Sequence, residues 1–239
     1  MKRLLFLFFF LAFLLPLPLG AYEVDELHEN AVLVPGFYDS DPEAIGPFPV
    51  LEWIDAYYAS GDTGRWSTTG SVGGTTGSGS QLWLLQVGGS ATTRTQVAAD
   101  VVVVSFTGDA NDGWMELFID GERYARVNGY SNPGENWAIG VMGLSEGRHT
   151  ILIKATGLND GQCCGHVAIR GAASAGAPIP IPESVDPESG PTSGGTPITI
   201  EGIGFLPGAT VLVGALPARD VVVEDFYTIT AVTPPAIQA

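Results

Sequence analysis

The sequence has little positive charge, few histidines and almost no cysteine. Its 239 residues include 10 lysines and arginines, three histidines and two cysteines, against 26 aspartates and glutamates. Such an acidic chain is repelled by nucleic acid and by anionic membrane surfaces, so we expect neither as a partner. The sequence also has no Gly-x-Ser-x-Gly elbow, no His-Glu-x-x-His pair and no phosphate-binding loop. These absences favour a protein that is not an enzyme.

Long apolar runs are missing except at the very start. Lys2 and Arg3 precede the unbroken apolar run Leu4–Leu15, and prolines and small residues then lead to Ala21. This layout is typical of a secretory signal peptide over residues 1–21, with an uncleaved anchor as the alternative. Cleavage lowers the basic residues from 10 to 8 against 26 acidic ones, a net charge of −18. We therefore expect a secreted or cell-surface protein that does not span the membrane.

The two cysteines, Cys163 and Cys164, are adjacent. Thiols of exported proteins tend to oxidise, and neighbouring cysteines close only a strained ring. A vicinal disulfide or free thiols are the favoured interpretations. Bonds to another chain and a metal site that includes His166 are the alternatives.

What the chain does contain is turn residues and short alternating apolar runs, which indicate an all-β fold. An acidic, irregular leader is expected over residues 22–49, a β domain over residues 50–173, and a linker rich in alanine, glycine and proline over residues 174–187. The continuous apolar run Val101–Val104 predicts a central strand that is covered on both faces. The pair Asp120 and Gly121 predicts a tight hairpin.

In the last segment, residues 188–239, apolar and polar residues alternate in short runs, as at Ile198 and Ile200, which is typical of a β-sandwich. It resembles the IPT/TIG domain, which has an immunoglobulin-like fold. The resemblance rests on the Gly190–Thr196 entry, the Ile198–Phe205 core and the closing run Ile229–Pro234. The family pattern continues beyond that run, so we expect the last strand of this sandwich to be lacking.

The domain at residues 50–173 is similar to galactose-binding-like jelly rolls, which include many carbohydrate-binding modules. The matching stretches are Met115–Gly121, Leu144–Ile151 and the pair Thr156 and Gly157. In sugar-binding members of that fold, loops at one end carry aromatic and amide side chains. The resemblance therefore implies a glycan or a surface protein as partner.

Several residues could bind a sugar, because an aromatic plane accepts its C–H face and short polar groups bond its hydroxyls. The alternative for the tryptophans is that they seal the ends of the sandwich, while Trp53, Trp83 and Trp114 are expected in the core. The ligand-binding candidates are Trp137, Tyr130, Asn132, Asn136, Asn159, Asp160 and Trp66.

A Ca²⁺ site is a further candidate, formed by Asp109, Asn111 and Asp112, because oxygen-rich turns suit this ion. An ordinary Asp/Asn turn is the competing interpretation. The sequence thus favours a non-catalytic glycan-binding or adhesion protein with the IPT/TIG domain as spacer. The alternatives are a structural surface or matrix protein, and an accessory part of a larger carbohydrate-active enzyme.

Overall fold

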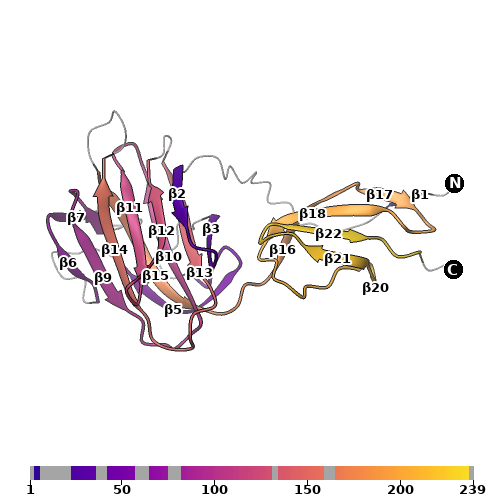
Figure 1. Ribbon diagram of the computed structural model, residues 1–239, viewed down its shortest axis with the longest axis horizontal. Coiled ribbons are helices and arrows are strands. Elements are labelled where there is room, and N and C mark those ends of the chain that lie inside the picture. The colour runs from indigo at the N-terminus through magenta and orange to yellow at the C-terminus, as the bar shows by residue number, and fades with distance from the viewer. Residues whose placement is uncertain are drawn as a thin grey trace. The chain divides into compact units, whose positions relative to one another are not determined.

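The computed structural model describes residues 3–5, 23–35, 42–56, 65–74, 82–130, 134–158 and 165–236. These residues form strands and no helix, so the all-β prediction is confirmed, and within them no helix is available to cross a membrane. Most of the predicted signal peptide, residues 6–21, lies outside these ranges. Contacts divide the chain into two compact units, Leu17–Ala177 and Met1–Pro16 with Pro178–Ala239 (Figure 1).

The first unit is a sandwich of two antiparallel sheets (Figure 1). One sheet has the order β3-β13-β10-β15-β5-β4, and β8 pairs with both β15 and β7. Its strands are β3 (Ala31–Pro35), β4 (Ala44–Ile45), β5 (Phe48–Asp55), β7 (Val72–Gly74), β8 (Leu82–Leu84), β10 (Val101–Gly108), β13 (Glu135–Val141) and β15 (Val167–Ala175).

The other sheet has the order β2-β12-β11-β14-β9-β6. Its strands are β2 (Glu23–Leu27), β6 (Ser67–Thr69), β9 (Ser90–Arg94), β11 (Trp114–Ile119), β12 (Glu122–Asn128) and β14 (Thr150–Gly157). Alternation decides the face of each residue: Met115, Leu117 and Ile119 of β11 point into the core, while the residues between them are half-buried on the outer face.

Strands β10 and β15 are buried along almost their whole length, as the apolar run Val101–Val104 predicts. Aromatic rings lie so close to the sheet that two positions have no room for a side chain. A Cβ atom on Gly140 would lie 2.4 Å from Phe48, and one on Gly171 would lie 2.3 Å from Trp53. The sandwich therefore has a layer of side chains on both faces of its central strands.

The described residues of the acidic leader, 23–35 and 42–49, are largely strand and not irregular, which corrects the prediction for them. They supply β2 to one sheet, β3 and β4 to the other, and the start of β5. Strand β2 was not predicted because it is an edge strand exposed at every position, so its sequence is charged and lacks the apolar pattern of a strand. Its acids pair with the neighbouring strand β12, Asp25 with Arg126 and Glu26 with Arg123.

The second unit contains a four-stranded sheet of order β16-β18-β22-β21 and two small pairs, β19 with β20 and β1 with β17. Buried Ile198, Ile200, Phe205, Ile229 and Ala231 form its core. The strands are β1 (Arg3–Leu5), β16 (Ile181–Asp186), β17 (Ser189–Pro191), β18 (Pro197–Ile203), β19 (Leu212–Val213), β20 (Leu216–Pro217), β21 (Arg219–Val223) and β22 (Thr228–Val232).

The predicted linker at residues 174–187 is largely strand, which is a second correction. Ser174 and Ala175 end β15, and Ile181–Asp186 form β16, which pairs with β18. Prolines misled the prediction, because proline is tolerated in an edge strand and β16 is one. Residues 176–180 connect β15 of the first unit to β16 of the second.

The close approach of Phe48 to the sheet makes Gly140 a sensitive position. We expect Gly140→Ala to lower the free energy of unfolding of the first unit by about 1–3 kcal/mol, because the methyl group overlaps a packed ring. Gly147→Ala is the control, since a Cβ there meets its nearest neighbour at 3.6 Å. Urea unfolding of both variants measures the difference, and equal stability would contradict the packing described.

Candidate ligand-binding site

Strand pairing brings the predicted ligand loops to one end of the first sandwich. The end of β10 pairs with the start of β13, Gly108 opposite Glu135. The start of β11 pairs with the ends of β12 and β14, with Trp114 opposite both Asn128 and Gly157. The ends of β10, β12 and β14 and the starts of β11 and β13 therefore lie at the same end of the sandwich, which we call the loop end.

The two tryptophans predicted to stack on a sugar do not face the solvent. Trp137 is 3% exposed and stacks on Phe106, with ring centroids 4.6 Å apart. Trp66 is 7% exposed and its indole N–H donates to the backbone oxygen of Asp55 at 3.1 Å. Both rings belong to the hydrophobic core, which favours the alternative that these tryptophans seal the sandwich.

The tryptophans expected in the core lie instead in half-buried positions. Trp114 is on the outer face of its sheet, where the guanidinium carbon of Arg126 lies 4.4 Å from its ring centroid. The ring of Trp53 covers Gly171 on the outer side of β15. The sequence was used to separate tryptophans in loops from those in strands. Burial depends instead on the face of the strand from which a side chain projects, and Trp137, expected in a loop, lies in β13.

Of the other candidates, the structure describes Tyr130 and Asn136, both half-buried. The backbone N–H of Tyr130 donates to Oδ1 of Asn128 at 3.2 Å, and Thr107 Oγ1 donates to Oδ1 of Asn136 at 2.8 Å. These bonds hold the two residues at the ends of β12 and β13. Asn132, Asn159, Asp160, Cys163 and Cys164 lie outside the described residues, so their predicted roles stay predictions.

The β10–β11 turn is held by its own side chains. Asp109 Oδ1 accepts the backbone N–H of Asn111 at 2.8 Å, and Asp112 Oδ2 accepts the backbone N–H of Asp109 at 2.9 Å. His166 Nδ1–H donates to Asn111 Oδ1 at 2.8 Å, which ties the turn to the segment before β15. Sequence reasoning placed His166 only beside the cysteines, because its partner is 55 positions away.

Asp112 is the unusual member of this turn, because its carboxyl group is buried. The residue is 2% exposed, and its Oδ1 has no hydrogen-bond partner among the described residues. Burial, reinforced by the nearby charge of Asp109, raises the pKa of Asp112 from 3.8 to about 8. The carboxyl group is therefore mainly protonated at neutral pH.

The proposed Ca²⁺ ligands already use one oxygen each in the hydrogen bonds of the turn. Within the described ranges, no group of three or more His, Cys, Asp and Glu residues is arranged to hold a metal ion. The geometry fits an Asp/Asn turn well, and the Ca²⁺ site stays a prediction. A cavity of about 10 Å³ beside Asp112 and His166 is too small for a sugar ring.

A family model matches most of the C-terminal part of the second unit. Residues 180–238 match the family model of the IPT/TIG domain, which confirms the resemblance seen in the sequence. A search of curated proteins finds no match to the chain.

Among solved structures, the chain is similar to the CBM36-1 domain of a multidomain xylanase from the hindgut metagenome of Trinervitermes trinervoides. The identity is 16% and the TM-score 0.35, over 45% of this chain and 94% of that one. It is also similar to an exo-β-1,3-galactanase from Phanerochaete chrysosporium, at 14% identity and TM-score 0.36, over 54% of this chain and 29% of that one. For a Paenibacillus xanthan lyase the values are 12% and 0.36, over 65% and 19%.

The chain thus spans nearly all of the CBM36-1 domain but less than a third of the galactanase and of the lyase. Likeness of this degree does not carry a ligand from one protein to another.

The burial of Asp112 makes stability depend on pH. A carboxyl group whose folded pKa is raised contributes stability that is complete below its unfolded pKa of 3.8 and is lost as the pH rises toward 8. The side chain in Asp112→Asn stays neutral at every pH. We therefore expect the free energy of unfolding of this variant, relative to that of the unsubstituted chain, to rise by at most about 1.4 kcal/mol per pH unit within that window.

Urea unfolding of the first unit between pH 5 and pH 8 (roughly the window in which the linkage acts) measures this gain. The exposed acid just before β10, changed as Asp100→Asn, is the control and should follow the unsubstituted chain. Parallel curves for the unsubstituted chain and Asp112→Asn would mean that the Asp112 carboxyl group is not buried as described.

Proposed function

We propose that the chain is a secreted or cell-surface, non-catalytic binding protein whose first sandwich recognises a glycan at the loop end. The observation that carries the proposal is the position of four half-buried polar residues, Tyr130, Asn136, Asn111 and His166, in or beside the strands that end at the loop end. Of these, Asn111 and His166 are in direct contact. Sugar hydroxyls need short polar partners of these kinds, and a half-buried aromatic ring can meet the apolar face of a sugar.

Export is supported by the charged start and apolar run of residues 1–21. The charge of the chain after cleavage suits a neutral or cationic partner better than an anionic one. The IPT/TIG unit would then act as a spacer that carries the sandwich.

A structural role without a small ligand is the second candidate. It is favoured by the burial of Trp66 and Trp137, which leaves fewer aromatic faces at the loop end than a stacking site would offer. In that case both units would serve as rigid spacers in a surface layer or matrix.

Tyr130 is the aromatic residue on which glycan binding depends in this proposal. We expect the full chain to bind a subset of a glycan array, and Tyr130→Ala to weaken that binding about tenfold, which corresponds to about 1.4 kcal/mol of aromatic contact. Glu146→Ala, an exposed change in the turn that follows β13, should bind like the unsubstituted chain.

The array is run with and without Ca²⁺, so that the predicted ion site is tested in the same experiment. Equal binding by Tyr130→Ala would remove the loop end as the site. Silence across the array in both conditions would favour the structural role.

A further inference from the structure

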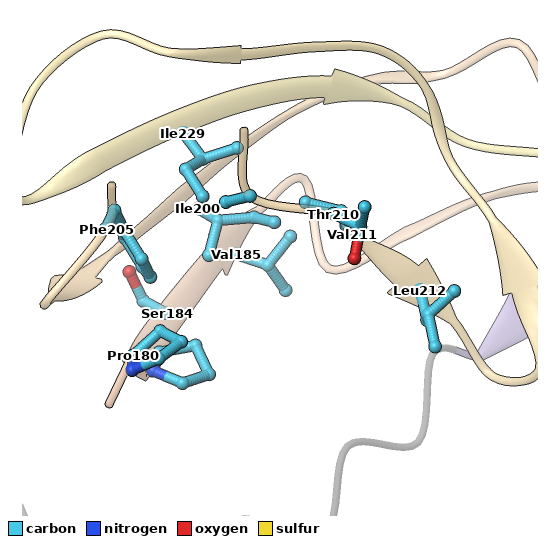
Figure 2. A pocket seen from close by; sticks show the side chains of 11 residues that line it. Pro180, Ser184, Val185, Ile200, Phe205, Thr210, Val211, Leu212 and Ile229 are labelled. Atoms are coloured by element: carbon cyan, nitrogen blue, oxygen red, sulfur yellow. The ribbon is translucent and has the colours of Figure 1, made fainter. Parts of the chain in front are cut away.

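The second unit has an opening into its hydrophobic core (Figure 2). A cavity of about 200 Å³ lies against buried Ile200, Phe205 and Ile229. Figure 2 shows Pro180, Ser184 and Phe205 on one side, Thr210, Val211 and Leu212 on the other, and Val185, Ile200 and Ile229 between them. The pocket is open to solvent, so it leaves apolar side chains of the core accessible to a group from outside.

The lining defines the chemistry of that group. Among the lining side chains, only Ser184 and Thr210 carry a polar group, and the rest are aliphatic, proline or phenylalanine. An apolar cavity of about 150 Å³ is large enough to take a benzene-sized molecule. The cavity therefore suits branched aliphatic or aromatic side chains and offers too few hydrogen-bonding partners for a sugar.

The backbone beside the cavity suggests how such side chains could be presented. Strand β19 pairs with β20, and in the part of the chain that the structure describes no strand pairs with its other edge. Leu212 lines the cavity yet is 56% exposed. A strand with an unpaired edge readily accepts another extended segment, whose alternate side chains would point toward the cavity.

The charge of residues 178–239 indicates which charge the partner carries. Arg219 is the single basic residue between Pro178 and Ala239, against seven acidic ones. The acidic residues are Glu183, Asp186, Glu188, Glu201, Asp220, Glu224 and Asp225. Like charges repel, so a second copy of the chain is disfavoured and a basic segment is favoured.

We propose that the opening in the IPT/TIG unit is a docking site for an extended segment of a protein partner that carries alternating apolar and basic side chains. Its apolar side chains fill the cavity beside Leu212, and its lysines or arginines complement the acidic net charge of residues 178–239. The unit would then be a protein-binding module as well as a spacer, independently of any glycan bound by the first sandwich.

A short synthetic peptide of alternating valine and lysine tests this site on the full chain. Methyl NMR of labelled isoleucines should show shifts at Ile200 and Ile229, which line the cavity. We expect Leu212→Ser to weaken the binding roughly tenfold, because it removes the exposed apolar group at the mouth. Leu206→Ser is the matched control, since Leu206 is 36% exposed and does not line the cavity.

A peptide of alternating valine and glutamate should bind far more weakly than the lysine peptide. Unshifted Ile200 and Ile229 methyl groups, or equal binding by Leu212→Ser, would overturn the docking site. Equal binding of the glutamate peptide would overturn the basic partner. If the same methyl groups shift with protein concentration alone, and sedimentation shows dimers, the proposed basic partner would be overturned and the occupant of the cavity would be a second copy of the chain.

Discussion

Burial of β10 and β15 on both faces is the constraint on which the first sandwich depends. The inner face packs on the opposite sheet, and the outer face is covered by Phe48 and Trp53. The aromatic rings can lie close to β15 because that strand carries small residues, namely alanines, a glycine and Ser174. The Ser174 hydroxyl donates to the backbone oxygen of Val97 at 2.9 Å. A pair of strands fixed from both sides gives the loops that leave it a rigid base.

That base explains how a polar turn persists at the edge of an apolar core. Asp112 loses solvent on folding, which is costly for a carboxylate, and burial accordingly raises its pKa. Bonds from the Asp109 backbone and between Asn111 and His166 hold the turn in place. The β10–β11 turn is thus preorganised, and preorganisation lowers the entropic cost of binding a ligand.

The sequence predicted most of the fold because alternation and turn residues are local signals. The hairpin at Asp120 and Gly121 and the alternation of β11 follow directly from them. It could not predict which tryptophans face inward, because that depends on which sheet lies opposite. Trp137 therefore lies in the core, where Trp114 was expected, and Trp114 lies half-buried on the outer face of its sheet. The charged strand β2 and the proline-containing strand β16 were missed because edge strands lack the apolar pattern of central ones.

Hydrogen–deuterium exchange of the full chain, followed residue by residue, tests the central claim that a doubly covered strand pair fixes the loop end. The account predicts that the amides of Val101–Phe106 and Val167–Ala175 exchange only through global unfolding of the first unit. The exposed edge strands β2 and β6 should exchange faster. Exchange of β10 and β15 at the rate of those edges would contradict the account.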